Sequence, residues 1–139
     1  MARTQKAGPA DEKITINLGP VDLGNIDLLV EEGFYGSRTD LIRAAIRRLL
    51  DDHRTVLNDA VTRRALTVGF VSFDRRHLEA VRKRKERLDV RVVGVFQVAD
   101  DVPATLADET LDRVWVLGSF RAPDVVVRRL GTKIVRGKT

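Results

Sequence analysis

The chain has 139 residues, of which 43% are hydrophobic and 32% charged, and its formal net charge is +5. This length fits one ordinary domain, or a small module joined to a second compact unit, and it excludes a large multi-domain enzyme. The composition is globular, no apolar run approaches the roughly 20 residues that cross a bilayer, and the absence of cysteine excludes disulfides and metal thiolates.

The positive charge is concentrated in the second half. Residues 1–55 contain eight Lys/Arg and nine Asp/Glu, whereas residues 56–139 contain seventeen and eleven. A basic surface attracts polyanions, of which nucleic acids and acidic lipids are the usual examples. The start of the chain lacks the apolar stretch of a secretory signal, so we expect a cytoplasmic, nucleoid-associated protein.

The first ordered element is expected to be a short strand. Residues 1–11 mix Gly, Pro, small and charged residues without a period and predict a disordered tail. Residues 13–18 then alternate, with Ile14, Ile16 and Leu18 on one face and Lys13, Thr15 and Asn17 on the other. This pattern predicts one half-buried strand.

Two helices should follow the strand. Pro20 suits the first turn of a helix over residues 20–32, and Gly33 is placed to end it in a left-handed cap. Ser37 is a good N-cap for a second helix, with Asp40 three residues later. Without Gly or Pro between residues 37 and 68, this helix either runs on or breaks near residues 51–52 into a third helix.

The second half is expected to be a small α/β unit with repeats. Gly69, Gly94 and Gly118 are 25 and 24 positions apart, and each stands in a short strand-like run that leads into a helix-like piece. Such a period is typical of a short solenoid or a layered α/β unit, although an ordinary α+β domain with a chance echo of glycine remains the alternative.

One strand and two amphipathic helices cannot bury their own apolar faces or pair a lone strand. Two copies can, by pairing residues 13–18 as an antiparallel ribbon over four interlocked helices. The outward side chains of such a ribbon fit the major groove of B-DNA.

Residues 12–18, the short helix, and residues 33–45 resemble the ribbon-helix-helix superfamily, in particular its CopG-like branch. The resemblance covers residues 12–53 and implies a dimeric DNA-binding transcriptional regulator. It implies that Lys13, Thr15 and Asn17 contact bases. It also implies that the backbone opening the second helix clamps a phosphate, at the positions Gly36, Ser37 and Arg38. The acidic pair at residues 11–12 departs from this pattern, because it would lie near phosphates.

The densest basic cluster consists of Arg82, Lys83, Arg84 and Lys85. Such runs are usually solvated helix faces, but this one could add sequence-independent phosphate contacts.

Other signals favour structural roles. His53 and His77 without cysteine are too few for a nickel-responsive regulator, so no metal or cofactor is expected. Asp101 and Asp124 adjoin probable helix starts and are expected to cap helices, and Trp115 is expected in the core. No phosphate-binding Gly loop or nucleophile elbow is present, which argues against an enzyme.

We therefore expect an α+β protein: a tail at 1–11, a ribbon-helix-helix domain at 12–55, a helical connector at 56–66, an α/β oligomerisation or partner-binding domain at 67–132 and a basic tail at 133–139. The expected function is a repressor that binds double-stranded operator DNA as a homodimer or dimer of dimers. Two alternatives are an antitoxin whose second half covers a toxin, and a DNA-coating or segregation protein that self-assembles through its second half.

Overall fold

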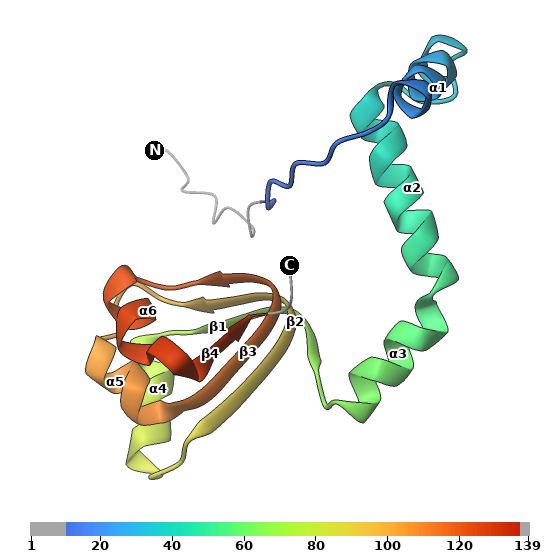
Figure 1. The fold of residues 1–139 in the computed structure, drawn as a ribbon. Coiled ribbons are helices and arrows are strands. Elements are labelled where there is room, and N and C mark those ends of the chain that lie inside the picture. The colour runs from blue at the N-terminus through green and yellow to red at the C-terminus, as the bar shows by residue number, and fades with distance from the viewer. Residues whose placement is uncertain (1–10, 137–139) are drawn as a thin grey trace, which may run out of the picture. The chain divides into compact units, whose positions relative to one another are not determined.

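The computed structural model describes residues 11–136 (Figure 1), and it contains both helices and strands, in agreement with a mixed α and β protein. The elements in chain order are α1 (Pro20–Glu31), α2 (Arg38–Asp52), α3 (Arg54–Arg63), β1 (Thr67–Phe73), α4 (Arg75–Lys83), β2 (Leu88–Val98), α5 (Ala104–Thr110), β3 (Leu111–Arg121), α6 (Asp124–Leu130), a short 3-10 helix (Gly131–Lys133) and β4 (Ile134–Arg136).

The chain forms two compact units. The N-terminal unit is Lys13–Arg63 and contains α1, α2 and α3. The C-terminal unit begins at Arg64, contains all four strands, and also includes Glu12. The connector expected at 56–66 falls largely within α3.

The ends of α1 follow from single residues. Pro20 occupies the first turn, where its missing N–H would have had no partner in the helix. Gly33 has a φ of +83°, a left-handed conformation that suits glycine. The N–H of Phe34 donates to Leu29 O at 3.1 Å and that of Gly33 to Val30 O at 3.1 Å, which is the Schellman arrangement. The expected helix and its glycine cap are confirmed.

The chain breaks between α2 and α3, which decides between the two alternatives left by the sequence. Ser37 caps α2, because its side chain accepts a hydrogen bond from the backbone N–H of Asp40 at 3.1 Å. At the other end, the N–H of His53 donates to Leu49 O and Leu50 O, both at 3.2 Å, and α3 starts at Arg54.

Residues 13–18, expected to form a strand, belong to no helix or strand in this single chain. A strand is defined by hydrogen bonds to a neighbour, and the neighbour that the sequence analysis expects is a second copy of the chain. The pairing of this segment therefore stays a prediction.

The C-terminal unit is a parallel four-stranded sheet in the order β1-β2-β3-β4. Between successive strands the chain passes through α4, α5 and α6, which lie on one face of the sheet (Figure 1). The core between helices and sheet is formed by Leu78, Val90, Val92, Phe96, Val98, Val102, Leu106, Ala107, Leu111, Val114, Val116, Val126 and Leu130. Along β2 most buried positions alternate with exposed or half-buried ones, because the other face of the sheet carries no helix of this unit.

Three glycines lie in one row across the sheet. Gly69 pairs with Gly94, and Gly94 pairs with Gly118. A Cβ on Gly94 would lie 3.0 Å from the carbonyl carbon of Gly69 and closer still to its oxygen, so the backbones approach too closely for any side chain. The sheet is parallel and open, and the solenoid suggested by the spacing stays an interpretation.

Three local expectations were wrong. Residues 134–136, expected in a basic tail, form β4 beside β3. Trp115 is half-buried on the face without helices, rather than in the core, because it alternates with the buried Val114 and Val116. Asp101 accepts a hydrogen bond from the backbone N–H of Arg75 at 3.1 Å, so it binds the start of α4, whose N-cap is Asp74, instead of the helix that follows it.

Candidate nucleic-acid interface

The segment expected to contact DNA has both of its faces open. Lys13, Thr15 and Asn17 are exposed. The intervening apolar side chains are exposed as well, Ile14 by 75% and Ile16 by 58%. A segment with apolar side chains on one face is stable as a strand only when that face is buried against other protein surface.

The helices of the N-terminal unit also leave their apolar side chains exposed. No residue between 13 and 63 is buried. The large apolar side chains that are exposed there include Leu28, Leu29, Phe34, Ile46, Leu49, Leu50, Val56 and Leu57. A folded domain normally buries many of its large apolar side chains, so this unit is incomplete as a single chain.

The start of α2 offers donors to an anion. The first N–H groups of a helix have no partner within the helix. Ser37 satisfies that of Asp40, which leaves the N–H groups of Arg38 and Thr39 without an acceptor among the described residues. Gly36 is exposed, and a Cβ at this position would lie 2.9 Å from a carboxylate oxygen of Asp40. The structure thus brings Gly36, Ser37 and Arg38 to one helix end, with an acidic side chain beside them.

Arg38 is already engaged through its side chain. Its Nε and Nη2 donate to the two carboxylate oxygens of Asp27 in α1, at 2.6 and 2.8 Å. These hydrogen bonds lower the pKa of Asp27 and raise that of Arg38. The guanidinium therefore ties α2 to α1, and a phosphate at this helix end would meet the backbone N–H of Arg38. The sequence carried no signal for this pair, because Asp27 looks like any exposed helix residue.

Glu12, whose charge departs from the family pattern, is neutralised within the C-terminal unit. Its carboxylate accepts a hydrogen bond from the hydroxyl of Ser119 and lies 3.5 Å from Nη2 of Arg121. These two hydrogen bonds hold the pKa of Glu12 below its usual value. The negative charge of Glu12 is therefore compensated.

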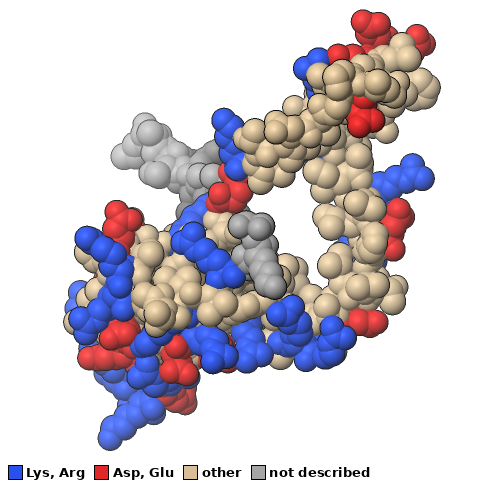
Figure 2. All heavy atoms as spheres, in the orientation of Figure 1, with Lys and Arg blue, Asp and Glu red and all other residues tan. Residues whose placement is uncertain are grey.

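The basic cluster Arg82 to Lys85 lies at the exposed end of α4. Arg82 is 3.5 Å from Glu109 and Arg84 is 3.1 Å from Glu86, whereas Lys83 and Lys85 form no ion pair with a described residue. Figure 2 shows acidic side chains interspersed with basic ones over this part of the C-terminal unit. Arg82 and Arg84 are therefore paired with carboxylates, and Lys83 and Lys85 are the members of the cluster whose charge is available to phosphates.

The two histidines have structural contacts. His53 ends α2, with its Nδ1 2.9 Å from Leu49 O, and the ring of His77 stacks on Phe73 at 4.5 Å. Across residues 11–136 no group of three potential metal ligands gathers, and no helix there has the length and apolar character to span a membrane.

A comparison with family models decides the classification. The model of the ribbon-helix-helix transcriptional regulator family matches residues 9–127. The chain belongs to this family. The match extends well beyond residues 12–53, which carry the resemblance in sequence, and includes most of the C-terminal unit. No curated protein and no solved structure matches the chain.

Membership of the ribbon-helix-helix family assigns the chain a coarse function, that of a DNA-binding transcriptional regulator. The family also implies dimerisation, which agrees with the exposed apolar side chains of the N-terminal unit.

Proposed function

We propose that this chain is a sequence-specific repressor that binds operator DNA as a homodimer through an antiparallel ribbon formed by residues 13–18 of two subunits. The main support for this proposal is the complete absence of buried residues between 13 and 63. Two copies can cover Ile14, Ile16 and Leu18 together with the exposed apolar faces of α1 and α2, whereas one copy leaves them in water.

Pairing these faces turns Lys13, Thr15 and Asn17 outward from both strands. An amide can form two hydrogen bonds with an adenine edge, and lysine can donate to guanine or to phosphate. A two-stranded ribbon fits the width of the major groove. These three residues are therefore proposed as the base-contacting set, six side chains in the dimer.

The start of α2 is proposed to hold a backbone phosphate on each side of the ribbon. Three observations support this phosphate site: the N–H groups of Arg38 and Thr39 have no acceptor within residues 11–136, Gly36 is exposed, and the helix dipole has its positive end here. Phosphate contacts of this kind fix the register of a protein on DNA without reading sequence.

The C-terminal unit is proposed to assemble dimers into a tetramer or to bind a protein partner. It has a core of its own, which favours a regulator over an antitoxin, whose toxin-binding segment usually folds only on binding. Light scattering separates the regulator from a DNA-coating protein. A discrete dimer or tetramer supports the regulator, and open-ended growth with DNA contradicts it. A cytoplasmic, nucleoid-associated location follows from this proposal.

The test is selection of bound fragments from a random duplex pool, followed by fluorescence anisotropy with the selected site. We expect Asn17→Ala to weaken binding to the selected site by about 1–3 kcal/mol and to have little effect on unrelated duplexes. Asn58→Ala is the matched control, because Asn58 is an exposed amide in α3. An equal loss on all duplexes would contradict base reading by Asn17.

A further inference from the structure

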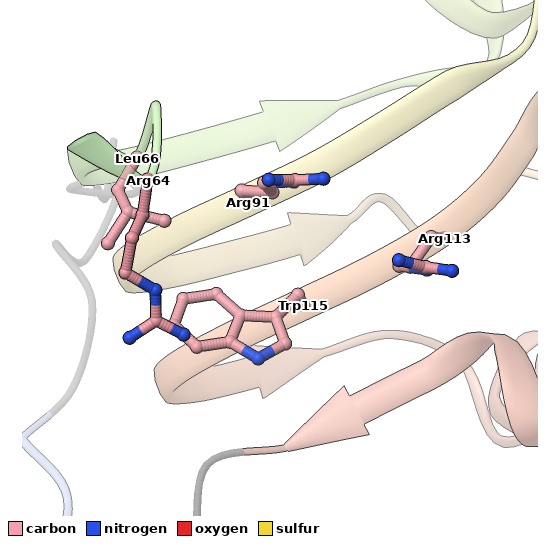
Figure 3. Close-up of a pocket in the computed structure, with 5 residues that line it drawn as sticks. All are labelled: Arg64, Leu66, Arg91, Arg113 and Trp115. Atoms are coloured by element: carbon pink, nitrogen blue, oxygen red, sulfur yellow. The ribbon is translucent and has the colours of Figure 1, made fainter. Parts of the chain in front are cut away.

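A hollow of about 200 Å³ lies on the face of the sheet that carries no helix. It is lined by Arg64, Leu66, Arg91, Arg113 and Trp115 (Figure 3), all of which belong to the C-terminal unit. Parallel sheets usually have both faces covered, so an open hollow here is unusual for this architecture.

Three guanidinium groups and no carboxylate line the hollow. Arg91 lies 3.0 Å from Asp89 of its own strand. The guanidinium of Arg64 stands 4.5 Å from the centre of the Trp115 ring, a cation–π contact that leaves its charge uncompensated. No described residue forms an ion pair with Arg113. At least two positive charges of the hollow are therefore available to an anion.

The sheet register holds these charges close together. Arg91 pairs with Trp115 across β2 and β3, and Asp89, the ion-pair partner of Arg91, pairs with Arg113. Arg91, Arg113 and Asp89 therefore lie on one face of the sheet. Asp89 compensates one of the three arginine charges of the hollow, so two positive charges remain in excess. The hollow therefore keeps a net positive charge, which attracts a ligand that carries negative charge.

The side chains that line the hollow further restrict the chemical class of the ligand. Guanidinium groups hold planar oxyanions, either carboxylate or phosphate, by paired hydrogen bonds. Trp115 and Leu66 offer apolar surface, and an indole stacks favourably on another ring. The volume is below the roughly 300–1,000 Å³ of sites for drug-sized molecules, which suits one ring with one acidic group.

We propose that this hollow is a binding site for a small organic anion, an aromatic or heteroaromatic ring that carries a carboxylate or a phosphate. The ring lies against Trp115 and Leu66, and the acidic group lies against Arg64 and Arg113, the two arginines of the hollow without an ion pair to a described residue. The site is separate from the residues proposed to contact DNA, so it adds a small-molecule ligand to the protein.

The chain contains a single tryptophan, so its fluorescence reports on this site. The full-length protein is titrated with benzoate, adenosine 5′-monophosphate and inorganic phosphate while Trp115 emission is recorded. We expect a saturable change with benzoate, with adenosine 5′-monophosphate or with both, and the better of the two shows whether carboxylate or phosphate is preferred. We expect inorganic phosphate to bind at least tenfold more weakly than the better ring-bearing probe.

Arg113→Gln should weaken binding of the better ring-bearing probe at least tenfold. Arg76→Gln, which removes an exposed arginine of α4, should leave it unchanged. Unfolding midpoints of both variants verify that they are folded. The proposal is overturned if no probe gives a saturable change, if Arg113→Gln binds like the parent, or if inorganic phosphate binds as well as the ring-bearing probes. A response to duplex DNA alone would also overturn it, in favour of a DNA phosphate contact.

Discussion

The row of glycines across the C-terminal sheet provides a quantitative test of its parallel register. Gly69 and Gly94 have nearly the same backbone, with φ of +127° and +134°, so alanine is strained at both. Around Gly69 a Cβ meets nothing within 4 Å, whereas at Gly94 it would run into the carbonyl group of Gly69. The two substitutions therefore differ in the steric contact alone.

The expected magnitudes follow from this difference. Backbone strain at a position of this kind amounts to about 1–3 kcal/mol, which is the whole effect expected for Gly69→Ala. Gly94→Ala adds an overpacking contact with an adjacent strand, which contributes about 1–3 kcal/mol more because neither backbone can move without breaking the ladder.

Urea unfolding of both variants, followed by Trp115 fluorescence at one protein concentration, measures these free energies for the C-terminal unit. If Gly94→Ala proves no less stable than Gly69→Ala, the strands do not approach as closely as described and the register is wrong.

Three further predictions concern the capped helix, one ion-pair cluster and the basic run. Ser37→Ala should lower the stability of the N-terminal unit by about 1 kcal/mol, measured by thermal unfolding followed by circular dichroism. Ser37→Asp should retain the cap but weaken DNA binding, because its carboxylate repels the phosphate. An unchanged DNA affinity of Ser37→Asp would argue against that phosphate contact. The pKa of Asp108 is lowered by hydrogen bonds from Lys133 and Arg129, so these contacts stabilise the fold above the ordinary pKa of the carboxyl group and lose this effect as the pH falls through the lowered value. The stability difference between the parent and Asp108→Asn in urea should accordingly shrink from pH 6 to pH 3, and a constant difference would contradict this. Replacing Arg82, Lys83 and Arg84 by Gln should make the salt dependence of DNA binding shallower, by up to about 0.9 in log–log slope for each phosphate that the variant no longer neutralises, and an unchanged slope would exclude the cluster from the interface.

Signals that act within a few residues could be predicted from the sequence. Pro20 at a helix start, Gly33 after a helix end and Ser37 three residues before Asp40 each determine a boundary through their own backbone or side chain. These boundaries lie where the sequence indicated, because no distant residue is needed to form them.

Features that depend on distant partners could not be predicted in this way. Asp101 stands before one helix but accepts a hydrogen bond from the first N–H of α4, since the parallel sheet brings the end of β2 beside the start of that helix. Trp115 alternates with core residues and looks like one of them, but a period of two does not say which face is covered. Arg91 and Arg113 are 22 positions apart, and only the strand register makes them neighbours.

The proposed mode of DNA binding depends on the pairing of residues 13–18 with the same segment of a second chain. Amide hydrogen exchange of Ile14 to Leu18 in the full-length protein, at a concentration where light scattering gives a dimer, measures this pairing. We expect some of these amides to exchange far more slowly than in an unstructured peptide, and the protection to decline as dilution separates the subunits. Exchange at the unstructured rate in the intact dimer would rule out the ribbon and, with it, the proposed contacts to bases.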